Sequence, residues 1–138
     1  MAAMPERERP PVGRRILLAD DNPTIHQAVT RVAERRGHEI IHATSGALTL
    51  SVALETQPDV IVLDMEFPDA DGRDVLRQLK AEPRTARIPV VVWSGRDGHD
   101  SDSRISLDLG AEDYVEKTDA HLLLLKLERV LLRLDQER

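Results

Sequence analysis

The sequence predicts an α/β fold of five βα units, a three-layer sandwich with a five-stranded parallel sheet in the middle. Two observations support this prediction. From Arg15 onward, short apolar runs rich in β-branched residues alternate with stretches of helical periodicity. Three of the apolar runs are nearly continuous, as expected for parallel strands that helices cover on both faces. A chain of 138 residues has room for one such domain.

The strands and helices are expected to follow one another in strict alternation. The apolar runs predict strands at Ile16–Ala19, Glu39–Ala43, Val60–Leu63, Val90–Trp93 and Asp113–Glu116. The intervening segments predict helices at Pro23–Arg36, Gly46–Glu55, Arg73–Ala81, 102–109 and Ala120–Leu134.

The first helix carries the clearest signals. Asn22 can cap the first helix, Pro23 suits its first position and Gly37 suits its end. The fourth helix begins with polar residues and has the weakest signal. In the last helix, one broad apolar face is expected to pack on the core, and it comprises Leu123, Leu124, Leu127, Val130, Leu131 and Leu134.

Right-handed crossovers leave few arrangements for such a sheet. By analogy with flavodoxin-like proteins, the expected strand order is 2-1-3-4-5. Residues 1–13 combine prolines and charges, which predicts a disordered tail or linker before a domain at residues 14–138.

Composition narrows the classes of function. The net charge is -6, and the first fifteen residues carry a local +2, so the remainder carries about -8. Such an acidic domain, with one Phe, one Tyr and one Trp, is not expected to bind nucleic acid. Cysteine is absent, and no apolar run could span a membrane or serve as a signal peptide. We therefore expect a soluble, cytoplasmic protein without a membrane partner.

Polar residues gather at the predicted carboxyl ends of the strands, where open α/β sheets bind ligands. The first strand ends in Asp20 and Asp21, the third in Asp64, the fourth in Ser94 and Gly95, and the fifth is followed by Lys117. Converging carboxylates need a compensating cation, and oxygen-only ligands suit Mg²⁺. With that ion bound, Asp64 could attack phosphorus as a nucleophile. Ser94 and Lys117 could contact the product, and Gly95 would leave a path for the phosphodonor.

Four ordered motifs carry a resemblance to a known family. They are ADDNP, VLDMEFPDADG, VVWSG and GAEDYVEK. Over Arg15 to Leu134 the chain resembles the receiver domains of bacterial response regulators. The resemblance implies that Asp64 accepts a phosphoryl group from a histidine kinase or a histidine phosphotransfer protein, and that the domain signals to a downstream protein effector. It also implies a signalling domain rather than an enzyme, with at most self-catalysed phosphorylation and dephosphorylation.

The resemblance assigns further roles by position. Asp21 and Asp64 would bind Mg²⁺ directly, Asp20 partly through water, and the main-chain carbonyl of Glu66 would complete the protein ligands. Ser94 and Tyr114 would form the switch pair that responds to the phosphoryl group.

One residue departs from the family pattern, and an acidic residue beside the nucleophile adds a further expectation. Thr118 stands where the family usually has a proline in a cis bond with the lysine, and a non-proline cis bond costs about 2.5 to 4 kcal/mol. Glu66, two residues after Asp64, is acidic, and we expect it to hinder the attacking water and slow dephosphorylation.

Other readings of the sequence stay open. A pseudo-receiver, a binding module not regulated by phosphorylation, is the alternative function. An aspartyl phosphohydrolase would need an acid-base Asp where Glu66 stands.

Several other residues are expected to have structural roles. Asp69 and Asp71 are expected to shape the turn before Gly72. Trp93 should point away from Ser94 and pack. Surface or capping roles are expected for His26, His38, His42, His99 and His121.

On the last helix, Leu125 and Leu132 fall outside the predicted core face. Since family receivers use the face of helix 4, strand 5 and helix 5 for partners, these two leucines are the candidates for a partner face or a homodimer contact. With its end just after the fifth helix, the chain is expected to act as a stand-alone receiver or a phosphorelay intermediate, or else to be a piece of a larger protein.

Overall fold

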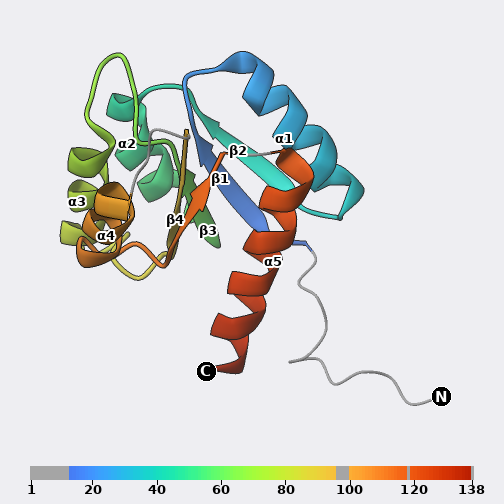
Figure 1. Cartoon of the computed structure of the whole chain (residues 1–138). Coiled ribbons are helices and arrows are strands. Elements are labelled where there is room, and N and C mark those ends of the chain that lie inside the picture. The colour runs from blue at the N-terminus through green and yellow to red at the C-terminus, as the bar shows by residue number, and fades with distance from the viewer. Residues whose placement is uncertain (1–12, 96–99, 118, 138) are drawn as a thin grey trace.

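The computed structural model describes residues 13–95, 100–117 and 119–137, and for residues 100–103 it describes the backbone only. Within these ranges, strands and helices alternate along the chain (Figure 1). The strands are β1 (Arg15–Ala19), β2 (Glu39–Ala43), β3 (Val60–Leu63), β4 (Val90–Ser94) and β5 (Asp113–Glu116). The helices are α1 (Pro23–Arg35), α2 (Gly46–Thr56), α3 (Gly72–Ala81), α4 (Asp100–Asp108) and α5 (Ala120–Gln136).

The five strands form one parallel sheet in the order β2-β1-β3-β4-β5, which confirms the predicted fold and strand order. The element boundaries agree with the predicted ones to within two residues. Ser94 belongs to β4 because it lies in register with Glu116 of β5. The α4 helix starts at Asp100, two residues before the predicted start. No described helix is long and apolar enough to cross a membrane.

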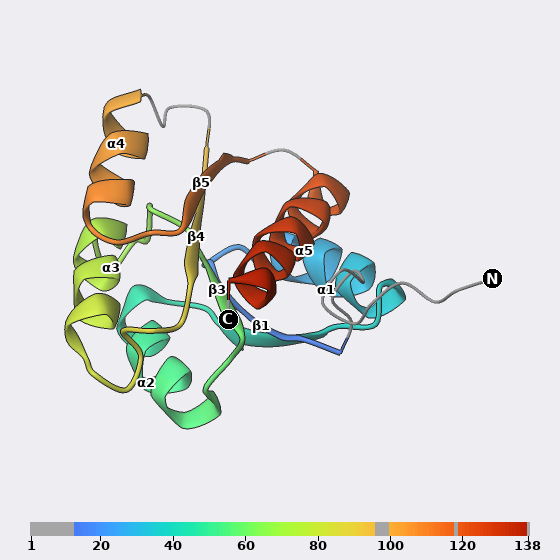
Figure 2. The same ribbon diagram turned by 90° about the horizontal axis from the view of Figure 1, so that it is seen from below.

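Two layers of helices cover the sheet (Figure 2). The α1 and α5 helices lie on one face, and α2, α3 and α4 lie on the other (Figures 1 and 2). Successive strand residues alternate between the two sides, so that Ile16 and Leu18 join the core under α1 and α5, whereas Leu17 and Ala19 join the opposite core. Both faces of the central strands are therefore buried, as their continuous apolar sequences predict.

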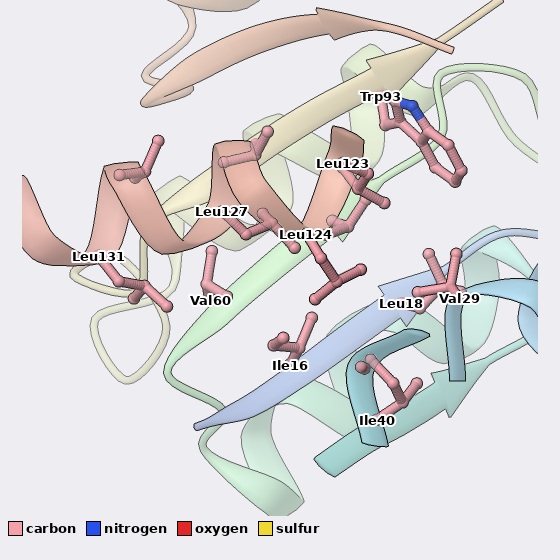
Figure 3. Close-up of a cluster of buried hydrophobic side chains, with 14 residues drawn as sticks. Ile16, Leu18, Val29, Ile40, Val60, Trp93, Leu123, Leu124, Leu127 and Leu131 are labelled. Carbon is pink, nitrogen blue, oxygen red and sulfur yellow. The ribbon is translucent and has the colours of Figure 1, made fainter. Parts of the chain in front are cut away.

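The core beneath α5 contains the predicted leucine face. Leu123, Leu124 and Leu127 are fully buried against Ile16, Val60 and their neighbours (Figure 3). Trp93 lies in the same cluster with 3% of its surface exposed, which confirms its predicted packing role (Figure 3). Because Trp93 is next to Ser94, this cluster extends to the carboxyl edge of the sheet.

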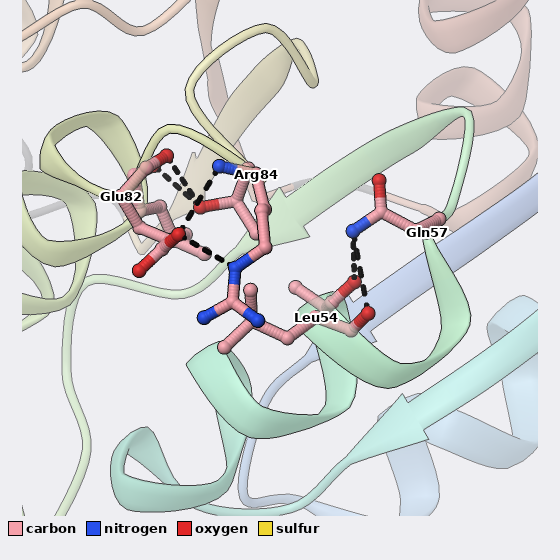
Figure 4. A network of polar contacts seen from close by, with 7 residues as sticks. Leu54, Gln57, Glu82 and Arg84 are labelled. Atoms are coloured by element: carbon pink, nitrogen blue, oxygen red, sulfur yellow. Dashed lines mark hydrogen bonds and ion pairs between the residues drawn. The ribbon is translucent and has the colours of Figure 1, made fainter.

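Local signals fix the helix ends. Asn22 caps α1 by accepting a hydrogen bond from the Thr24 N–H, and Pro23 follows at the first position, both as predicted. At the carboxyl end of α2, the capping residue Gln57 has a left-handed φ of 47°. Its side-chain amide donates a hydrogen bond to the Leu54 carbonyl at 3.3 Å (Figure 4). Glu82 and Arg84 form an ion pair just after α3 (Figure 4).

A buried carboxylate ties α5 to α1 and to the start of β2. Glu128 accepts hydrogen bonds from Arg36 Nε at 2.9 Å and from His38 Nε2 at 2.8 Å. Burial alone would raise its pKa, but the hydrogen bonds from these two side chains outweigh burial and lower the pKa of Glu128. No sequence pattern predicted this network, which joins residues about ninety positions apart in the chain.

Candidate functional site

Three aspartates meet at the carboxyl edge of the sheet, as the sequence predicts. Asp20 and Asp21 follow β1 and Asp64 follows β3, and these two strands are neighbours. One carboxylate oxygen from each aspartate lies within 4.8 Å of the others. Asp20 and Asp64 are 1% and 6% exposed, whereas Asp21 is open to solvent. Two of the three negative charges are therefore held out of bulk water.

Backbone hydrogen bonds hold the two buried carboxylates in place. Asp20 Oδ1 accepts the Asn22 N–H at 2.8 Å, and Asp64 Oδ1 accepts the Glu66 N–H at 3.3 Å. The Asp64 N–H continues the sheet ladder by donating to the Ala19 carbonyl at 2.9 Å. Backbone groups thus help to position the Asp20 and Asp64 side chains at the carboxyl edge of the sheet.

Lys117 brings a positive charge into this cluster from the end of β5. Its Nζ lies 2.7 Å from Asp20 Oδ2 and 3.6 Å from Asp64 Oδ2. It also lies 5.4 Å from the centroid of the Trp93 ring, within the range of a cation–π interaction. The ammonium is therefore held between two carboxylates and an aromatic face.

Asp64 has the perturbed acidity expected of a reactive carboxyl. Burial raises its pKa from the ordinary 3.8 to about 6, and the charge of Asp20 adds to this effect while the nearby Lys117 opposes it. A strongly perturbed group at the rim of a sheet is typical of functional sites.

The donor set fits a hard divalent cation. Asp20, Asp21 and Asp64 supply only carboxylate oxygens, and their mutual repulsion is partly unrelieved because Lys117 contributes a single positive charge. Mg²⁺ prefers such oxygen ligands and keeps several waters in its shell. The predicted acidic pocket is therefore present in the structure.

The remaining predicted site residues lie around this cluster. Ser94 is 4% exposed and borders a surface pocket with Glu66 and other residues of the loop after β3. A Cβ atom added at Gly95 would meet nothing within 4 Å, so the space beside it is open. Tyr114 on β5 is partly buried against the core beneath α2 and α3. Thr118, the residue of the unusual Lys-Thr bond, lies outside the described residues.

The loop between β3 and α3 is built by Asp69, Asp71 and Gly72, and the first two take the turn-shaping roles predicted for them. Asp69 accepts hydrogen bonds from the Gly46 and Ala47 N–H groups and so caps α2, while Asp71 caps α3. At Gly72 a Cβ atom would lie 2.4 Å from Met65 Cα and 2.8 Å from the Asp64 carbonyl oxygen. Glycine is therefore required at this position, where the first residue of α3 packs directly against the backbone of the loop that carries Asp64.

The expectation that histidines lie at the surface is wrong for two of them. His26 is 7% exposed and His38 is 4% exposed, because one bonds the Asp20 carbonyl and the other bonds Glu128. His42 and His121 are exposed as expected, and His99 lies outside the described residues. The spacing of histidines along the chain did not reveal these contacts, which depend on how α1 and α5 pack on the sheet.

Comparison with known proteins agrees with this fold and shows the family. The model of the response regulator receiver domain matches residues 16–128. Protein PilH of Pseudomonas aeruginosa is 33% identical over 118 residues, covering 85% of this chain and 97% of PilH. The DNA-binding regulator RpaA of Synechocystis is 35% identical over 123 residues, which cover 88% of this chain. The crystal structure of a response regulator from Desulfuromonas acetoxidans has 30% identity and a TM-score of 0.77, with coverage of 88% and 98%.

A five-stranded parallel sheet with an acidic pocket and a lysine at its carboxyl edge defines a phosphoacceptor-type signalling domain. With the matching family model over most of its length, the chain belongs to the response regulator receiver domain family of two-component systems. The matched region spans about half the length of RpaA and of other transcriptional regulators that it resembles.

Proposed function

We propose that this chain accepts a phosphoryl group from the phosphohistidine of a histidine kinase or a histidine phosphotransfer protein onto Asp64. The reaction depends on Mg²⁺ and switches the binding of a downstream protein. The observation that carries the proposal is the placement of Asp64 among Asp20, Asp21 and the Lys117 ammonium.

Of the two buried aspartates, Asp64 is the better nucleophile because its oxygens are less engaged by hydrogen-bond and ion-pair partners. Both oxygens of Asp20 have close partners, the Asn22 N–H at 2.8 Å and Lys117 Nζ at 2.7 Å. The corresponding distances for Asp64 are 3.3 Å to the Glu66 N–H and 3.6 Å to Lys117 Nζ. A weakly held carboxylate oxygen keeps more of its lone-pair reactivity.

In the transfer step, an Asp64 oxygen forms a bond to phosphorus while the N–P bond of the donor breaks. The electron pair of that bond stays on the donor imidazole, which then takes a proton. When bound by Asp20, Asp21, Asp64 and the Glu66 carbonyl, Mg²⁺ would screen the repulsion between the two anions. Lys117, at the end of a flexible stem, would then neutralise part of the charge added to Asp64.

Ser94 and Tyr114 are the proposed switch pair. Ser94 lies at the end of β4, next to Gly95 and the open space beside it, so its hydroxyl could hydrogen-bond a phosphoryl oxygen on Asp64. Tyr114 lies on the adjacent strand β5, and its ring would move inward as the hydroxyl is drawn to the phosphate.

The proposed output surface is the face of α4, β5 and α5. Leu125 on α5 is 40% exposed, and Leu132 is half-buried on the same helix. A downstream effector or a second copy of the chain would cover this face once the switch pair has moved.

The test is phosphorylation of the full chain by acetyl phosphate with Mg²⁺, followed by intact mass measurement. One labile phosphoryl adduct is expected, lost in Asp64→Asn and on chelation of Mg²⁺, and kept in the control Asp74→Asn on the outer face of α3. A folded protein that gains no adduct would contradict the proposal and favour a pseudo-receiver that binds partners without phosphorylation.

A further inference from the structure

A pair of histidines lies beside the acidic pocket on the α1 face of the sheet. His26 on α1 and His42 on β2 place their Nδ1 atoms 2.7 Å apart, with ring centroids separated by 4.9 Å. Both rings line an open surface pocket of about 460 Å³, together with Gln27, Thr30, Arg31 and Glu34. None of these six residues has a role in the phosphoacceptor chemistry.

The hydrogen bonds of His26 define which of its two ring nitrogens carries the proton. Its Nε2 lies 2.6 Å from the Asp20 carbonyl oxygen, which can only accept, so Nε2 carries the proton. In the neutral ring, Nδ1 is then a bare lone pair directed toward His42. Metal-binding histidines are held in this way, with the second ring nitrogen donating to a backbone carbonyl.

His42 completes the pair in a form suited to a metal. Partial burial and the neighbouring His26 ring lower the pKa of His42, which favours its neutral state at physiological pH. Since His26 Nδ1 carries no proton, His42 Nδ1 carries one and donates it across the 2.7 Å contact. When His42 Nδ1 becomes a ligand, this proton is exchanged through solvent to Nε2 of the same ring, where water can accept its hydrogen bond because His42 is exposed.

We propose that His26 and His42 bind a transition-metal cation of the Zn²⁺ class through their Nδ1 atoms, at a site separate from the acidic pocket. Imidazole nitrogens select such borderline ions, whereas the three aspartates suit hard ions such as Mg²⁺. Two Zn–N bonds of 2.0 to 2.1 Å at a tetrahedral angle place the nitrogens about 3.3 Å apart. The present 2.7 Å contact must open by about 0.6 Å to reach that distance, which a movement of the exposed His42 ring can supply.

The pocket provides for the rest of the coordination shell. Thr30, one turn after His26 on α1, has a buried hydroxyl without a hydrogen-bond partner among the residues that the structure describes. This hydroxyl is available to a metal-bound water, which would fill a position that no third protein ligand supplies. Arg31 and Glu34, which also line the pocket, carry opposite charges.

The experiment is a calorimetric titration of the full chain with ZnCl₂ in the presence of millimolar Mg²⁺, which occupies the acidic pocket. One Zn²⁺ per chain is expected. In His42→Ala the affinity should fall at least about tenfold, as it should in His26→Gln, whereas His121→Ala, which removes an exposed histidine elsewhere, should bind like the parent protein.

The Asp64→Asn variant separates this site from the acidic pocket, and it should bind Zn²⁺ unchanged. The proposal is overturned if the parent protein binds no Zn²⁺, if His42→Ala binds as tightly as the parent, or if binding is lost in Asp64→Asn alone. Because His42 is exposed, its substitution is expected to leave the fold intact even where that of the buried His26 does not.

Discussion

The ammonium of Lys117 lies 2.7 Å from Asp20 Oδ2, closer than to the oxygens of the proposed nucleophile Asp64. The lysine therefore occupies the negative potential that would otherwise attract a divalent cation. This ion pair is part-buried and is flanked by the Trp93 ring, so it is screened less than a surface pair would be.

Replacing Lys117 with Met should have opposite effects on metal binding and on chemistry. Mg²⁺ affinity is expected to rise about thirtyfold, since the repulsion between one positive charge and a divalent ion some 4 Å away is worth about 2 kcal/mol even in a watery environment. Phosphorylation by acetyl phosphate should slow, because the product loses its cation. Calorimetry and intact mass measure the two effects. Lys126→Met, which breaks only the peripheral pair with Asp113, is the control. If Lys117→Met bound Mg²⁺ more weakly than the parent protein, Lys117 would not compete with the ion for the acidic pocket.

The raised pKa of Asp64 predicts a pH-dependent cost in stability. Its pKa is 3.8 in an unperturbed chain and about 6 in the fold, so the folded protein holds the proton more tightly. The resulting stabilisation is complete below pH 3.8 and is lost as the pH rises toward 6. Without Mg²⁺, Asp64→Asn should therefore be more stable than the parent by about 1 to 2 kcal/mol at neutral pH, after allowance for solvent screening.

Urea denaturation of the parent protein and of Asp64→Asn in EDTA, across this pH range, tests the sign of the stability difference between them. The stability difference should grow from near zero at pH 4 and level off above pH 6. A difference that is constant with pH would mean that the Asp64 carboxyl titrates normally in the fold.

Glu66 should control the lifetime of the phosphorylated form. It is exposed in the loop after β3, its N–H bonds Asp64, and it borders the same pocket as Ser94. A carboxylate in this position should hinder the approach of the attacking water to phosphorus, so Glu66→Asn should lose its phosphoryl group several times faster. The decay of the intact-mass adduct measures this rate, with Glu112→Gln near β5 as the control. An unchanged lifetime would remove Glu66 from the mechanism.

Gly72 should tolerate no side chain. A Cβ atom at this position would lie 2.4 Å from Met65 Cα, so Gly72→Ala must displace either α3 or the loop that carries Asp64. A loss of about 3 kcal/mol in unfolding free energy is expected, together with slower phosphorylation. Gly95→Ala is the matched control, since its Cβ atom would meet nothing within 4 Å, and its stability should equal that of the parent. Equal stability of the two variants would contradict this packing.

Leu125 tests the proposed output surface. Placing a charge on this exposed residue should reduce self-association or effector binding of the phosphorylated chain without lowering its stability. Sedimentation velocity of Leu125→Glu, with and without acetyl phosphate, measures this effect. Leu48→Glu substitutes an equally exposed leucine on α2, outside this face. If both variants sediment like the parent under every condition, the chain does not self-associate through Leu125.

The sequence was sufficient to predict the sheet order and the acidic cluster because both follow from short-range patterns. Continuous apolar runs mark parallel strands, and the residues that follow such strands must meet at one edge. Asp20, Asp64 and Lys117 were therefore predictable as neighbours, although their individual distances were not.

Contacts between elements far apart in the chain were not predictable. The pairing of His26 with His42 depends on how α1 lies over β2, and the burial of Glu128 depends on the approach of α5 to Arg36 and His38. A lone histidine or glutamate on a helix has no sequence signal that separates such contacts from a solvated surface. The start of α4 was also missed by two residues, since its polar sequence lacks an apolar period to mark its first turn.

The contact between Lys117 and Trp93 has a spectroscopic consequence. The chain contains one tryptophan, and its indole lies 5.4 Å from the ammonium that the proposed chemistry draws toward Asp64. The intrinsic tryptophan fluorescence of the protein would thus come from one residue in a defined environment. Movement of the cation away from the ring should alter its quantum yield, so that the occupancy of the acidic pocket can be followed in real time on the unlabelled protein.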